Sequence, residues 1–98
     1  MLDELHLINT KSSWQMMEKL AKDIRRNYLQ RLSLIQAGLN DHSVVALAQI
    51  VKSSKSLISL DLSWNKLTLR EIMPMLEVLS TNRRLKNLNL SWNNLSDN

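Results

Sequence analysis

His6, Ser33 and Asp61 are the three side-chain types of a hydrolytic triad, and they stand 27 and 28 residues apart in this 98-residue chain. If each lies on a strand and the strands pair side by side, about 4.8 Å apart, they form one row across a sheet. A triad needs the imidazole between the hydroxyl and the carboxylate, whereas Ser33 would occupy the middle of this row. No glycine-rich turn offers an oxyanion hole either. We therefore expect a solvated polar row and no enzyme.

Metal and cofactor chemistry lack the residues that they need. The chain has no cysteine, and its two histidines, His6 and His42, are expected on different elements. Gly38 is the only glycine, so no glycine-rich phosphate-binding loop can form. No apolar run approaches the ~18 residues of a membrane span, and the N-terminal residues do not resemble a signal peptide. We expect no metal, no cofactor, no membrane span and a cytoplasmic location.

The chain is built from four copies of one leucine pattern. The copies begin at Leu2, Leu29, Leu57 and Leu85, and each has further leucines three and five places later. Leucine alternating with polar residues is typical of a short strand with one buried face. The pattern predicts one domain, residues 1–98, with repeats 2–28, 29–56 and 57–84 and a partial repeat 85–98.

A helix is expected after each strand. Eleven places into the units stand residues that cap helix N-termini well, namely Ser13, Asn40, Thr68 and Ser96. Apolar residues then follow at helical spacing: Met17, Leu20, Ala21 and Ile24; Val44, Leu47, Ala48 and Val51; Ile72, Met75, Leu76 and Leu79. Thr68 and Glu71 have capping-box spacing. Pro74 falls inside the third helix and should kink it or delay its start by a turn.

The pattern LxxLxLxxNxL followed by a helix, at 27 to 28 residues per unit, resembles the ribonuclease-inhibitor-like class of leucine-rich repeat. The resemblance covers essentially the whole chain. It implies an α/β fold, a leucine-rich-repeat solenoid of right-handed β–α units, with a parallel sheet on the concave face and helices on the convex face. Asn65 and Asn93 hold the asparagine position and are predicted to be structural turn residues, whereas the first two units have Thr10 and Ala37 there.

Neither end of the sequence shows the polar cap that usually closes an array of repeats. The first unit begins at Leu2, and the sequence stops just after the expected helix cap Ser96. We expect a segment of a longer repeat protein, or a chain whose ends are covered by a partner.

Trp64 and Trp92 stand seven places into their units, where the strand passes into the turn. Asn9 and Gln36 hold the same place in the earlier units, so the position is expected to face solvent and to need no aromatic ring. Two interpretations stay open. The rings stack on each other and shield the turn, or they anchor a partner, because exposed tryptophan is enriched in binding hot spots.

Basic residues recur in the segment that follows each helix: Arg25 and Arg26, Lys52 and Lys55, Arg83 and Arg84. With a net charge of +4, such a stripe could meet an acidic tail, acidic lipid or nucleic acid. It could equally reflect the preference of cations for helix C-termini. No aromatic residue interleaves with the stripe, so we favour the second interpretation and do not expect a nucleic-acid partner.

The function predicted is a non-catalytic module for protein–protein interaction or scaffolding. The candidate contacts lie on the concave face and at the strand ends: Trp64, Trp92, Arg31, Asp61, Ser33 and Asn89. The resemblance leaves two alternatives, a structural component of a cytoskeletal or ciliary assembly and a regulator of an enzyme such as a GTPase, as activator or inhibitor. The partner is expected to be protein, within a larger assembly or a longer solenoid.

Overall fold

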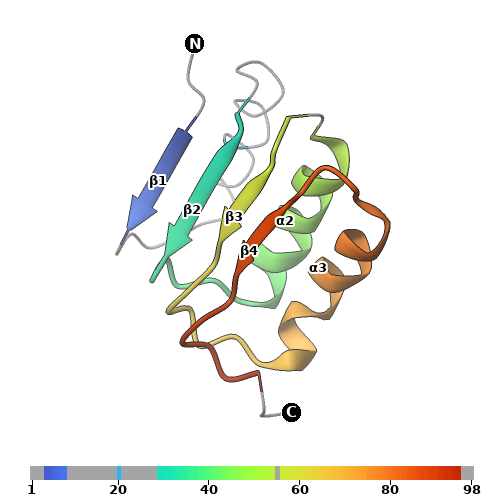
Figure 1. Cartoon of the computed structure of the whole chain (residues 1–98). Helices are drawn as coiled ribbons and strands as arrows, with labels where there is room; N and C mark the ends of the chain where they lie inside the picture. The colour runs from blue at the N-terminus through green and yellow to red at the C-terminus, as the bar shows by residue number, and fades with distance from the viewer. Residues whose placement is uncertain (1–3, 9–19, 21–28, 55, 96–98) are drawn as a thin grey trace.

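The computed structural model describes residues 4–8, 20, 29–54 and 56–95, and these form an α/β arrangement (Figure 1). The elements are β1 (Glu4–Ile8), β2 (Arg31–Ile35), α2 (Asp41–Ser53), β3 (Ser59–Asp61), α3 (Leu69–Thr81) and β4 (Asn87–Asn89). The four strands make one parallel sheet in the order β1-β2-β3-β4. Both of these helices cover the same face of that sheet.

Neighbouring strands pair in a register that repeats the spacing of the sequence. Leu5 lies opposite Leu32, Leu32 opposite Leu60, and Leu60 opposite Leu88. The predicted strands and their parallel, sequential order are therefore confirmed for the described residues. Successive side chains of a strand point to opposite faces, so each leucine that faces the helices leaves a polar neighbour on the other face.

The core lies between the sheet and the two helices. Its strand side consists of buried leucines from β2 and β3 and their flanks, Leu32, Leu34, Leu60 and Leu62. All four residues of the stripe predicted for α2 are buried, and in α3 Ile72 and Met75 are buried. Leu76 and Leu79 are only partly buried, because α3 has α2 on one side and no described helix on the other.

The helix starts follow the predicted caps. Asn40 Oδ1 accepts a hydrogen bond from the Ser43 amide at 3.0 Å. Thr68 and Glu71 form the full capping box, with the Thr68 amide donating to Glu71 Oε1 at 3.0 Å and the Glu71 amide donating to Thr68 Oγ1 at 3.3 Å. This box fixes the start of α3 at Leu69, so the delay predicted from Pro74 is wrong. Pro74 lies inside the helix.

Several predictions fall outside the described residues. They concern Thr10, the cap Ser13, most of the first helical stripe, the basic residues Arg25, Arg26 and Lys55, and the cap Ser96. Leu20, the described member of that stripe, is buried. Among the described residues, neither helix has the length and apolar character that crossing a membrane requires.

Replacing Leu60 by alanine should lower the free energy of unfolding by about 2–5 kcal/mol, because a fully buried leucine leaves a cavity. Its register partner Leu88 is 37% exposed, so Leu88→Ala is the matched control and should cost distinctly less. Urea unfolding of both variants followed by circular dichroism measures the difference. Equal losses would contradict the placement of the core between β3 and the helices.

Candidate partner-binding surface

The turn after β2 is held by a side chain from the next unit. Asn65 is buried, and its Oδ1 accepts from the amides of Ala37 at 2.9 Å and Leu39 at 3.4 Å. Its Nδ2 donates to the carbonyls of Leu34 at 2.7 Å and Leu62 at 2.9 Å. One amide thus satisfies backbone groups of two neighbouring units, which a turn would otherwise leave unpaired.

Asn93 repeats this arrangement one unit later. Its Oδ1 accepts from the amides of Asn65 at 3.2 Å and Leu67 at 2.9 Å, and its Nδ2 donates to Leu62 O at 2.9 Å and Leu90 O at 3.1 Å. The backbone amide of Asn65 is thus bonded directly to the side chain of Asn93. We call these linked asparagines and their bonds the asparagine ladder.

In the three later units, the residue just before the asparagine position, which Ala37 holds in the second unit, has a left-handed backbone. The φ angles are 52° at Gln36, 62° at Trp64 and 60° at Trp92. The amides of Gln36 and Trp64 each donate at 3.1 Å to a carbonyl of the following unit, at Ser63 and Ser91 respectively. We call these three positions the rim, and at Gln36 and Trp64 the backbone is held by the same kind of bond to the following unit.

The two tryptophans meet at the rim. Their ring centroids are 4.6 Å apart and the ring planes differ by 12°, so the rings are stacked. Trp64 is 49% exposed and Trp92 is 69% exposed. The stack therefore shields each ring on one side only, and a large aromatic surface remains open to solvent.

The local backbone does not explain why tryptophan stands at the rim. A left-handed conformation is unusual for a bulky residue and costs on the order of 1–2 kcal/mol. Both tryptophans bear this cost, about 2–4 kcal/mol together, whereas the one stacked pair returns only about 0.5–1.5 kcal/mol. Gln36 adopts the same φ region without a ring, so the turn itself accepts a polar residue.

On the exposed sheet face, the row His6, Ser33 and Asp61 forms as predicted. His6 Nδ1 lies 2.8 Å from Ser33 Oγ, and His6 Nε2 lies 3.4 Å from Glu4 Oε1. The imidazole therefore stands between a hydroxyl and a carboxylate, an arrangement that sequence reasoning missed. The sequence did contain a signal for it. Glu4 and His6 are two residues apart on one strand, so their side chains lie on the same face of the sheet.

Among the described residues, the surroundings of the Ser33 hydroxyl do not favour hydrolysis. Ser33 is only 8% exposed, so a substrate carbonyl has little access to its hydroxyl. Ser33 lies within β2, which pairs with β1 on one side and β3 on the other, and an oxyanion hole needs free donors. Glu4 also pairs with Arg31, at 3.7 Å. Among the described residues, no three His, Cys, Asp or Glu side chains gather where they could hold a metal ion.

The other predicted contacts are partly engaged by their own strand ends. Asp61 Oδ1 accepts from the Ser63 amide at 3.0 Å, and Asn89 Oδ1 accepts from the Ser91 amide at 2.9 Å. Asn89 Nδ2 also donates to Asp61 Oδ2 at 3.4 Å. These side chains stabilise the turns that lead to the rim.

The structure divides the predicted contacts into two groups. Trp64 and Trp92 come together at the rim, whereas Arg31 lies at the start of its strand, about 17 Å away along the sheet by strand rise. Sequence reasoning did not single out Ile8, which is 58% exposed and pairs with Ile35 on the same face. The sequence did contain a signal for this pair, because Ile8 and Ile35 both stand six places after the first leucine of their units, on the same face as the polar row.

The comparisons with known proteins give the fold and no family. A solved structure of "Leiomodin-1 Actin-Binding Site 2 (ABS2)" is similar to this chain, with a TM-score of 0.78 and 22% sequence identity. The likeness covers 96% of this chain and 54% of the other, so this chain spans about half of its length. No family model and no curated protein matches the sequence.

Replacing both Trp64 and Trp92 by glutamine should change the free energy of unfolding by less than about 1.5 kcal/mol, because the lost stacking is the main term. Glutamine is chosen because Gln36 already adopts this backbone. Thermal and urea unfolding measure the change. A loss of several kcal/mol would show that the tryptophans belong to the structural framework.

Proposed function

We propose that this chain is a leucine-rich-repeat module of the ribonuclease-inhibitor-like class that binds a protein partner through the tryptophan pair at the rim. The single observation that supports this most is the pair itself, two stacked indole rings that are 49% and 69% exposed, on turns held by the asparagine ladder. Large aromatic side chains on a rigid support lose little entropy on binding and are enriched in hot spots.

The class of partner that we propose is a cytoskeletal protein, with actin as the first one to test. The basis is the likeness in fold to a region named as an actin-binding site. The proposal places the module in the cytoplasm, in association with the cytoskeleton. A ciliary assembly or an enzyme such as a GTPase remains an alternative source of the partner.

We propose further that the module acts without catalysis. The buried hydroxyl of Ser33 and the engagement of Glu4 by both His6 and Arg31 support this. The polar row on the sheet face then serves as a hydrated border beside the aromatic contact, as polar residues do around the centre of many interfaces.

Wild-type protein should co-sediment with actin filaments, and the variant carrying Trp64→Gln and Trp92→Gln should lose at least about tenfold in affinity, a difference of about 1.4 kcal/mol. The matched control replaces two other exposed apolar residues of α3, Leu69 and Met73, by glutamine. This control should bind as the wild type does.

Two results would count against the proposal. If both double variants bind equally, the tryptophan pair is not the contact. If the wild type binds neither filaments nor monomeric actin, the partner is not actin, and crosslinking mass spectrometry from native extract then decides whether the rim is used. Crosslinks confined to the helices and the segments after them would rule the rim out.

A further inference from the structure

A groove runs between α2 and α3 on the side of the molecule away from the sheet. Two adjoining hollows of about 380 and 310 Å³ share Lys52, Val78 and Thr81. One hollow is also lined by residues spaced about one helical turn apart on the two helices, Val45, Ala48 and Gln49 of α2 and Pro74 and Glu77 of α3. The other is completed by Asn82, Arg83 and Arg84. The groove is thus partly apolar at one end and basic at the other.

The basic end holds charges that the described protein does not neutralise. Lys52 lies in the last turn of α2, and Arg83 and Arg84 follow the end of α3. None of the three forms a salt bridge with a carboxylate in the part of the chain that the structure describes. Helix C-termini attract cations, which explains one such residue well. The same preference does not require Lys52, Arg83 and Arg84 around one hollow whose described lining residues include no carboxylate.

Asn82 holds the backbone of this basic end in place. Its Oδ1 accepts from the amides of Arg84 at 2.8 Å and Leu85 at 3.1 Å. Its Nδ2 donates to Val51 O, in the last turn of α2, at 3.4 Å. One side chain therefore ties the backbone after α3, which carries the two arginines, to the last turn of α2.

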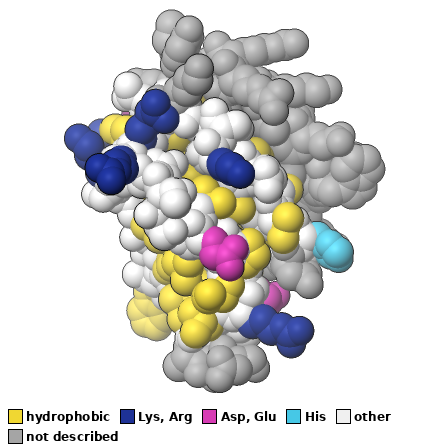
Figure 2. All heavy atoms as spheres, turned by 90° about the vertical axis from the view of Figure 1, so that its right-hand side faces the viewer, with side chains coloured by type: hydrophobic (Ala, Val, Ile, Leu, Met, Phe, Trp, Pro, Cys, Tyr) yellow, Lys and Arg dark blue, Asp and Glu magenta, His cyan; other side chains and the backbone are white. Residues whose placement is uncertain are grey.

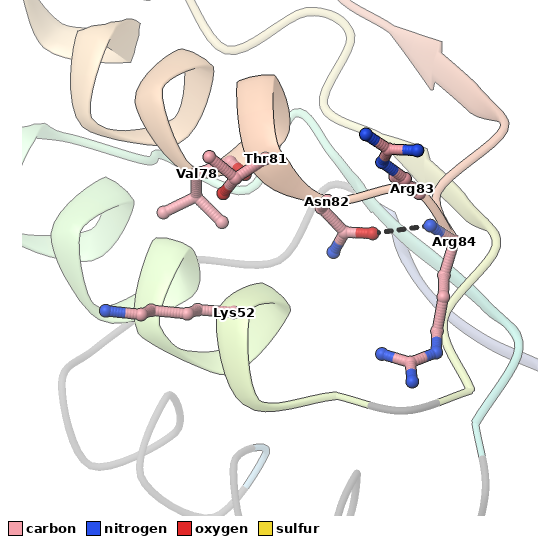
Figure 3. Close-up of a pocket in the computed structure, with 6 residues that line it drawn as sticks. All are labelled: Lys52, Val78, Thr81, Asn82, Arg83 and Arg84. Carbon is pink, nitrogen blue, oxygen red and sulfur yellow. Dashed lines mark hydrogen bonds between the residues drawn. The ribbon is translucent and has the colours of Figure 1, made fainter.

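The directions of the side chains indicate what this end can bind. Figure 3 shows the guanidinium groups of Arg83 and Arg84 on opposite sides of the chain and the Lys52 ammonium group pointing away from both. Such charges do not converge on a single phosphate, which needs donors around one point. They suit several carboxylates spread along an extended chain.

We propose that this groove is a second docking site and that it binds an acidic segment of a partner protein. Apolar side chains of that segment lie over Val45 and Val78, and its carboxylates lie against Lys52, Arg83 and Arg84. Figure 2 shows most Lys and Arg side chains of this face toward its upper end and hydrophobic side chains below them, with a further basic side chain low on the right. The site is separate from the rim and does not depend on the function proposed for it.

Glu77 sets the direction of the bound segment. It lines the apolar half of the groove and is exposed, so it repels a carboxylate placed there. The acidic residues of the segment therefore lie toward the ends of the helices, and its apolar residues lie toward Pro74 and Val45.

The test measures fluorescence anisotropy of a labelled peptide that joins a leucine-rich half to a glutamate-rich half, titrated with the whole chain. The variant Arg83→Glu with Arg84→Glu should bind at least about tenfold more weakly. The matched control is Lys66→Glu with Arg70→Glu, which makes the same change in net charge with exposed residues near the start of α3. Val45→Ser should also weaken binding, since Val45 is 48% exposed on the apolar half.

Binding that is lost in the arginine variant, retained in the control and reduced by added salt supports the site. Equal loss in both charge variants shows that only net charge matters, and the proposal is then wrong. It is also overturned if the peptide does not bind at low salt, or if oligothymidylate or phosphatidylserine vesicles bind through these arginines and the peptide does not. Chemical-shift changes on the wild type, expected at residues 45–52 and 74–84, locate the peptide without any variant.

Discussion

The asparagine ladder is the interaction on which the rest of the arrangement depends. A turn at the end of each strand leaves backbone amides and carbonyls without partners, and burying such groups unpaired costs about 1–3 kcal/mol each. Asn65 and Asn93 supply those partners from the following unit. The leucines provide most of the driving force for packing, but the ladder holds the turns after β2 and β3 and aligns each with the following unit.

The two surfaces proposed for binding follow from that alignment. At the rim, equal turns on adjacent units place Trp64 and Trp92 in register, and only this makes a stack with centroids 4.6 Å apart. Behind the sheet, the same register sets α2 beside α3 and leaves a groove between them, which Asn82 closes at its basic end. In both places an asparagine side chain holds a turn of the chain: Asn65 and Asn93 do so at the ends of the strands, and Asn82 does so after α3.

Much of the fold was predictable because each unit repeats its pattern. The alternating leucines predicted four strands in parallel, and Asn40 and Thr68 marked the helix starts. Of the two effects expected from Pro74, the delayed start does not occur, because Thr68 and Glu71 form a capping box and α3 begins at Leu69. At the site, exposure of the tryptophans was predictable from Gln36, but their left-handed backbone was not, since tryptophan is among the residues that avoid it. The contact of His6 with Glu4 depends on side-chain rotamers, which a sequence pattern does not specify.

Amide hydrogen exchange tests the central claim most directly, because the ladder predicts protection at particular amides outside the strands. The Ala37 and Leu67 amides, each 2.9 Å from an asparagine oxygen, should exchange as slowly as those of the core strands β2 and β3. In the variant Asn65→Ala the protection at Ala37 should fall first, while the amides of α3 keep theirs. Rapid exchange at Ala37 and Leu67 in the wild type, at the rate of unstructured peptide, would contradict the claim that the ladder holds the turns.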